Sequence, residues 1–255
     1  MGDQPGRHTQ AQAQAMKHVL YAFTWSYGAE FTLDPALRPP LAAALADYSG
    51  DIYARLHSLD PQYTTKSGAD DPPWQMGDGF HMAVDYRRLL SVLRAVSTDP
   101  EGYAAIHSAL TRYAAQDLGY VPADAQGDDF TVPPARSGRA LGALDGVAFS
   151  TIERLDSEQA RKWQGSMVDS LLKTSIEDRT YNQDPSAYIT AAWLHGLRTA
   201  PRDAQADYLR AQPVDMARIW VEARGIGDSA QQGLLAAVET SAAAARSEAK
   251  RVLKR

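Results

Sequence analysis

The sequence predicts an all-α protein, a multi-helix bundle of about eight or nine helices with two long loops and no significant sheet. Three observations predict this class. Apolar residues recur in steps of three and four along most of the chain. Capping residues and prolines stand where these patterns begin, and glycines stand where they end. No stretch alternates apolar and polar residues as a half-buried strand would.

The first helix is predicted within residues 9–27, which are rich in alanine and glutamine and carry apolar residues at helical spacing. Asp34 and Pro35 open the next helix, because aspartate caps free backbone amides and proline suits the first helical position. The prolines of 38–40 should delay or bend this helix, and Gly50 should weaken its middle.

Two long segments are predicted to be loops rich in proline and aspartate. Residues 59–79, LDPQYTTKSGADDPPWQMGDG, hold three prolines and three glycines without a helical period. Residues 120–134, YVPADAQGDDFTVPP, have the same character. Long loops in compact domains often carry function, so both segments are of interest for a site.

Residues 79–118 between these loops predict a helical hairpin. The first helix has an apolar stripe that starts at Met82 and ends at Val96, and the second begins at Thr98-Asp99-Pro100 and ends at Gly119. The two helices should pack antiparallel and offer a shared apolar face to further helices.

The best internal boundary lies near residue 130 and divides the chain into halves of 1–130 and 131–255, unless both halves form one continuous domain. The second half shows helical patterns from Leu141 onward and ends in an alanine-rich helix, 228–254, with basic residues at its end.

Composition excludes several functional classes. The 255 residues carry a net charge of -5, so no attraction to nucleic acid is expected. The absence of cysteine excludes disulfides, thiolate metal sites and cysteine nucleophiles. No segment resembles a signal peptide or a membrane span, which predicts a soluble protein in the cytoplasm or one exported by a signal-peptide-independent system.

The residues available for chemistry are few. No histidine pair has metal-ligand spacing, and no phosphate-binding, dinucleotide-binding or serine hydrolase motif occurs, so neither a metal nor a cofactor is predicted. If the chain is an enzyme, the candidates are His81, Asp70, Asp71 and Asp85, in or beside the first loop.

Candidate binding residues lie in the same loops. Trp74 follows two prolines, and we expect it to be an exposed contact residue. Asp128 and Asp129 form an acidic pair in the second loop, where solvated charge is the simplest interpretation.

Residues 77–200 resemble the C-terminal helical region of large actinobacterial proteins with WXG-type modules, which are associated with type VII secretion. The resemblance rests on the hairpin GFHMAVDYRRLLSVLRAVSTDPEGYAAIHSALTRYAAQDLG, the loop rich in proline and aspartate, and SGRALGALDGVAF. In that family the W-x-G turn precedes the Y-x-x-x-[DE] signal, whereas here Trp163-Gln164-Gly165 follows Tyr113–Asp117. The resemblance therefore implies a context of secretion and names no functional residue.

Three functions remain open from the sequence. The leading hypothesis is a non-enzymatic helical interaction module with a protein partner, part of a secretion-associated protein or effector. The second is a toxin or effector enzyme with a site in a cleft near the two loops. The third is a membrane-active effector, suggested only by the alanine-rich final helix with its basic end.

Overall fold

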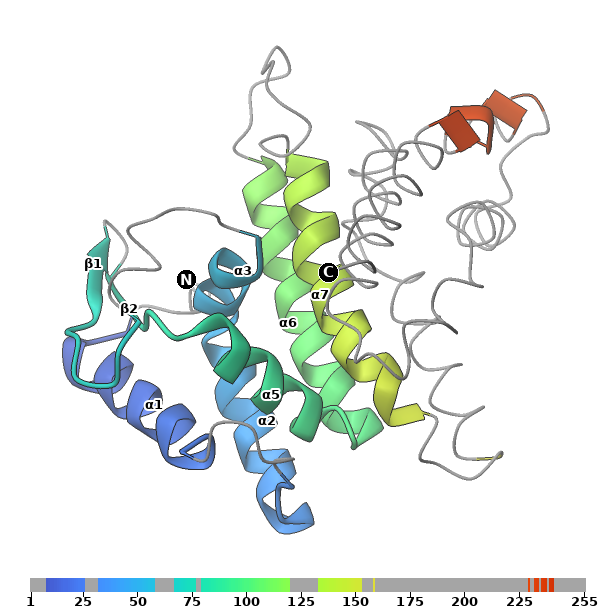
Figure 1. Ribbon diagram of the computed structural model, residues 1–255. Coiled ribbons are helices and arrows are strands. Elements are labelled where there is room, and N and C mark those ends of the chain that lie inside the picture. Colours follow the sequence, from blue (N-terminus) through green and yellow to red (C-terminus); the bar gives the residue numbers. More distant parts are fainter. Residues whose placement is uncertain are drawn as a thin grey trace, which may run out of the picture.

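A computed structural model describes residues 8–25, 32–57, 67–76, 79–119 and 133–152, with isolated positions between 158 and 240 (Figure 1). These residues are mostly helical, which confirms the predicted class, and they also contain a small two-stranded sheet. The helices are α1 (Gln10–Phe23), the 3₁₀ helix η1 (Pro35–Leu37), α2 (Arg38–Asp47), α3 (Ser49–His57), α5 (Tyr86–Val96), α6 (Pro100–Gly119) and α7 (Pro133–Ile152), and the strands are β1 (Trp74–Met76) and β2 (Gly79–His81). Most of the helices predicted after residue 152 lie outside the described residues.

Helix α7 lies at the centre of the core. It packs against α3, α5 and α6, and Figure 1 shows α6 and α7 side by side. Residues 137–148 are all buried, so α7 is enclosed on every face rather than along one stripe. The first turns of the predicted second half therefore share a core with the first half.

The predicted helical hairpin is present as α5 and α6, but it begins later than expected. Residues 79–81 form β2, and Met82 is buried in an extended segment before α5. The carboxylate of Asp85 accepts a hydrogen bond from the backbone N–H of Arg88 at 3.1 Å and so caps α5. Asp99 caps α6 in the predicted way, accepting from the N–H of Gly102 at 3.2 Å.

The strand pair corrects the prediction that residues 59–79 hold only loop. β1 and β2 are antiparallel, with Trp74 opposite His81 and Met76 opposite Gly79. Gly79 has a φ of 151°, a conformation that other residues rarely adopt. Strands of three residues are too short for an alternating pattern to be recognised, which is why the sequence did not predict them.

The helix predicted after Asp34 is divided into three pieces. Asp34 accepts from the N–H of Ala36 at 2.9 Å and caps η1, as predicted. Pro39 and Pro40 fall in the first turn of α2, where their missing N–H groups are not needed. The chain then breaks at Tyr48 between α2 and α3.

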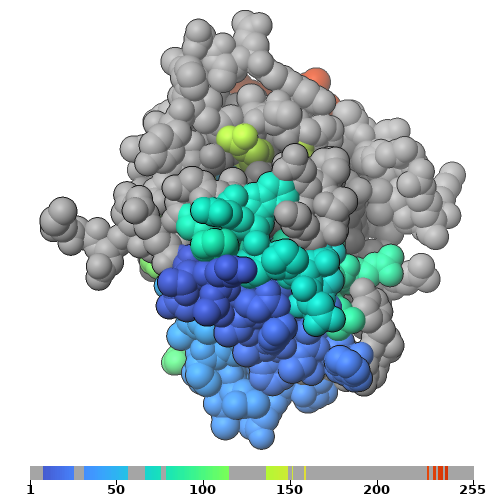
Figure 2. All heavy atoms as spheres, turned by 90° about the vertical axis from the view of Figure 1, so that its left-hand side faces the viewer, coloured from blue at the N-terminus to red at the C-terminus, as the bar shows by residue number. Residues whose placement is uncertain are grey.

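Helix α1 buries Ala13, Met16 and Leu20 and also makes polar contacts with the rest of the molecule. Three side chains on α1 donate hydrogen bonds to backbone carbonyls of the segment 67–71: Gln14 to Ala69 (3.0 Å), Lys17 to Asp71 (2.9 Å) and Tyr21 to Ser67. Arg88 of α5 donates to the carbonyl of Thr24 at the end of α1 and lies over the Tyr21 ring. In Figure 2, α1 (dark blue) and the segment that contains the β1–β2 hairpin (teal) form one continuous surface.

The close approach of the end of α5 to the start of α6 depends on a glycine. A Cβ atom at Gly102 would lie 3.0 Å from both Cγ1 and the carbonyl oxygen of Val96, and 3.5 Å from Cβ of Ala42. We expect Gly102→Ala to lower the free energy of unfolding by about 1 kcal/mol or more, measured by urea denaturation. The control is Gly233→Ala, where nothing lies within 4 Å. Its alanine should raise stability by about 0.5 kcal/mol through helix propensity, and stabilisation by both variants would contradict the packing at Gly102.

Candidate functional site

Five ionisable side chains meet where α2 ends and α3 begins, and we call them the histidine cluster. The helices supply Asp47, Tyr48 and Asp51, the arm before α1 supplies His8, and the end of β2 supplies His81. Two segments distant in sequence thus each bring one imidazole to a carboxylate at the same junction.

The contact between His81 and Asp51 is the most buried of the cluster. His81 Nδ1 and Asp51 Oδ1 lie 2.5 Å apart, and the two side chains are 8% and 3% exposed. Burial raises the pKa of Asp51, while the hydrogen bond from His81 and the bond from the backbone of Met82 oppose this rise. The pair is therefore a proton-sharing contact in a low-dielectric site.

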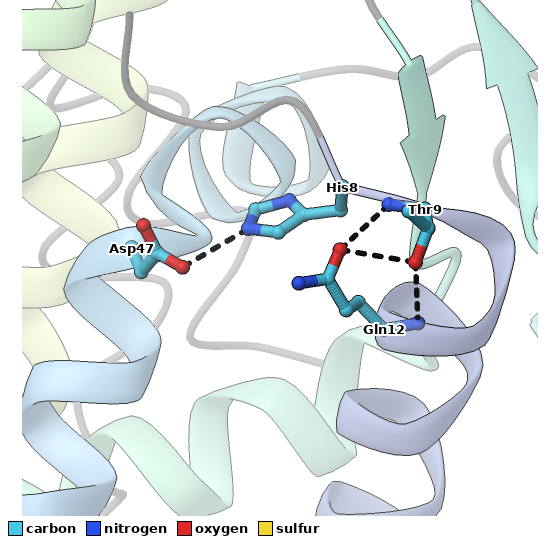
Figure 3. Close-up of polar contacts among 4 residues, drawn as sticks. All are labelled: His8, Thr9, Gln12 and Asp47. Atoms are coloured by element: carbon cyan, nitrogen blue, oxygen red, sulfur yellow. Dashed lines mark hydrogen bonds and ion pairs between the residues drawn. The ribbon is translucent and has the colours of Figure 1, made fainter. Parts of the chain in front are cut away.

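The contact between His8 and Asp47 also pairs an imidazole with a carboxylate, but it is more exposed to solvent. His8 Nε2 and Asp47 Oδ2 lie 3.1 Å apart, and the Asp47 side chain is 63% exposed (Figure 3). The imidazole stacks on the Tyr48 ring with centroids 3.7 Å apart and an interplanar angle of 5°. Thr9 and Gln12 form a capping box that begins α1 directly after His8 and so fixes where the arm enters the helix.

Tyr48 contributes an uncharged phenol. Burial, followed by the carboxylates of Asp51 and Asp47, raises the pKa of Tyr48 to about 12. At neutral pH this residue therefore packs against His8 and does not act as a base.

A carboxylate that orients an imidazole is the arrangement used in general acid–base catalysis. Among the residues that the structure describes, no group of three histidine, aspartate or glutamate side chains is placed to hold a metal ion. The described geometry supplies a proton-binding pair, His81 and Asp51.

The candidate catalytic residues predicted from the sequence lie in different places. His81 is in the histidine cluster, and Asp85 caps α5. Asp71 closes a turn by accepting from the N–H of Gly68 at 2.7 Å, and Asp70 beside it is exposed. These aspartates act on the cation of Lys17 rather than on His81.

Among the candidate binding residues, Trp74 is half-buried on β1 as the cross-strand neighbour of His81. Cross-strand neighbours point to the same face of a sheet, which accounts for this partial burial. Asp128, Asp129 and most of the proposed cleft between the two loops lie outside the described residues.

The sequence did not point to Asp51 as the partner of His81, or to His8 as part of the same cluster. The one available signal was the spacing of Asp47 and Asp51, four residues apart, which would suggest a shared helix face. Nothing in the sequence indicates which histidines approach that face.

A second buried polar group lies between α6 and α7. The hydroxyl of Tyr103 donates to Oδ1 of Asp145 at 2.8 Å, and both side chains are buried. Burial raises the pKa of Asp145 to about 7, although the bond from Tyr103 opposes the rise. One turn further along α6, burial lowers the pKa of His107 to about 4.

No protein family, curated protein or solved structure matches the chain. The resemblance to proteins associated with type VII secretion therefore stays a prediction, and function has to be argued from the described residues.

Asp145 should make stability depend on pH. Its folded pKa lies above its unfolded value, so the stability it contributes is present at acid pH and is lost as the pH rises toward about 7. Asparagine keeps the acceptor for Tyr103 and cannot ionise. The free energy of unfolding of Asp145→Asn minus that of wild type should increase by about 2–3 kcal/mol as the pH rises from about 5 to 8. This follows from about 1.4 kcal/mol per pKa unit.

The measurement is urea denaturation of both proteins at several pH values. The lowered pKa of His107 acts in the opposite direction, because the stability it contributes is lost as the pH falls from about 6.5 toward 4. His107 is present in both proteins, so its effect cancels in the difference. Parallel pH profiles would show that Asp145 does not titrate in this window.

Proposed function

We propose that this chain is a non-enzymatic helical interaction module that binds a protein partner through the side carrying α1 and η1. The observation that supports this most is the exposure of three large apolar side chains: Val19 (40%), Leu37 (44%) and, above all, Trp25 (82%). Exposed tryptophans are enriched among the residues that dominate protein–protein binding energy.

Three of the polar residues nominated from the sequence favour the same proposal, because each has a structural task. Asp85 caps a helix, Asp71 closes a turn, and His81 is buried against Asp51. A side chain so used is poorly placed to approach a substrate.

The proposal includes the context expected from the sequence. In this context the chain is part of a secretion-associated protein or effector, and a signal-peptide-independent export route accompanies it. The resemblance of residues 77–200 is the sole support for this part.

A second candidate function is an effector enzyme in which His81 is the general base and Asp51 orients it. The distance of 2.5 Å between their atoms supports this candidate, since a base needs such an orienting partner. The burial of both side chains, which keeps them from a substrate, places it second.

A membrane-active effector has less support. Its motivating segment, 228–254, is largely outside the described residues. Within the described part of the chain, no helix combines the length and apolar character needed to cross a membrane.

Site-specific photocrosslinking in the native cells tests the interaction proposal. A photoreactive phenylalanine analogue replaces Trp25 in one variant and Arg87, an exposed residue of α5, in the matched control. We expect a discrete crosslinked protein with the probe at position 25 and none at position 87. With the purified partner, Trp25→Ala should weaken binding about tenfold or more, and Arg87→Ala should change it by less than about twofold.

Equal crosslinking at both positions would contradict the proposed surface. A growth defect on expression that disappears in His81→Gln, and persists in Trp25→Ala, would instead favour the enzyme.

A further inference from the structure

The histidine cluster joins three parts of the fold that are distant from one another in the sequence. His8 lies directly before α1, and His81 ends β2. The N–H of Phe80 donates to the carbonyl of His8 at 3.0 Å, so the arm and the hairpin are also bound to each other. Both imidazoles then reach carboxylates at the α2–α3 junction.

Among the described residues, the charged groups that the structure places next to these imidazoles come from α2 and α3. α2 contributes Asp47, and α3 contributes Asp51. Tyr48 between them is a neutral phenol. One turn beyond Asp51, the guanidinium of Arg55 donates to the carbonyl of Val84 at 2.8 Å and lies near the Tyr86 ring, and arginine does not titrate in the physiological range.

The charge balance of this group depends on protons. With the His81 imidazole neutral, the carboxylate of Asp51 carries an almost fully buried negative charge. A proton gained by His81 cancels this charge at hydrogen-bond distance. When the β1–β2 hairpin separates from the junction, Asp51 becomes hydrated, and its charge is then stabilised by water without a proton on His81. The docked arrangement therefore binds protons more tightly than the separated one.

We propose that the histidine cluster is a proton-dependent latch, which holds α1 and the β1–β2 hairpin on the α2–α3 junction more tightly as the pH falls from about 8 to 6. The raised pKa of Asp51 favours docking at lower pH as well, because the docked carboxyl keeps its proton to a higher pH than the separated one. The latch is independent of the proposed partner surface and can be tested without a partner.

Lys17 is the one other buried titratable contact described between α1 and the body, and its effect is opposite. Burial lowers its pKa, with Asp71 and Asp70 opposing, so its docked form binds a proton less tightly. Lys17→Arg keeps a charged donor near the carbonyl of Asp71 and removes this titration.

The test is hydrogen–deuterium exchange of the full chain at about pH 6, 7 and 8, with rates corrected for intrinsic exchange. We expect the protection factors of amides in α1 and the hairpin to rise about tenfold in wild type from about pH 8 to 6. In Asp51→Asn, which keeps an acceptor for His81, the rise should fall below about twofold.

Three further variants keep the test decisive if Asp51→Asn folds poorly. His81→Gln keeps a hydrogen-bonding side chain opposite Asp51 without an imidazole and should reduce the rise. His18→Gln removes an exposed histidine of α1 outside the histidine cluster, and Lys17→Arg removes the opposing titration. Both should keep a rise at least as large as that of wild type.

A flat profile in wild type would overturn the latch. So would an unchanged rise in both Asp51→Asn and His81→Gln, or loss of the rise in Lys17→Arg. Amides of α6 report global unfolding, which Asp145 and His107 make pH-dependent, and this contribution is common to wild type and variants.

Discussion

The buried contact between His81 and Asp51 is the constraint on which the outer part of this fold depends. Removing two ionisable groups from water costs several kcal/mol per ion, and only a close, hydrogen-bonded partner offsets that cost. The separation of 2.5 Å provides this partner, provided that β2 and the first turn of α3 keep their positions. The break at Tyr48 and the extended entry into α5 belong to the geometry that lets the two side chains meet.

Two kinds of interaction hold the molecule together. Around α7, apolar side chains are buried on every face, and burial of their surface contributes to stability. Helix α1 buries Met16 and Leu20 in the same core, and it adds hydrogen bonds from Gln14, Lys17 and Tyr21 to backbone carbonyls. The proposed partner surface and the proposed latch both lie on the side of the fold that carries α1.

The helices could be predicted because their signals are local. Asp34 and Asp99 cap helices as the sequence suggests, and the apolar stripe of 89–96 is buried as its spacing requires. The three-residue strands could not be predicted, because they are shorter than any recognisable period. The histidine cluster was hidden for another reason. His81 is 30 residues from Asp51 and His8 is 39 from Asp47, so both contacts arise only when separate elements dock.

A double-mutant cycle on His81 and Asp51 tests the central claim most directly. The free energies of unfolding of wild type, both single alanine variants and the double variant give the coupling energy of the pair. The account predicts a coupling of about 2–3 kcal/mol. The same cycle on His8 and Asp47, whose carboxylate is largely exposed, should give less than about 1 kcal/mol. Additive effects at His81 and Asp51 would contradict the claim that this contact holds the hairpin to the helices.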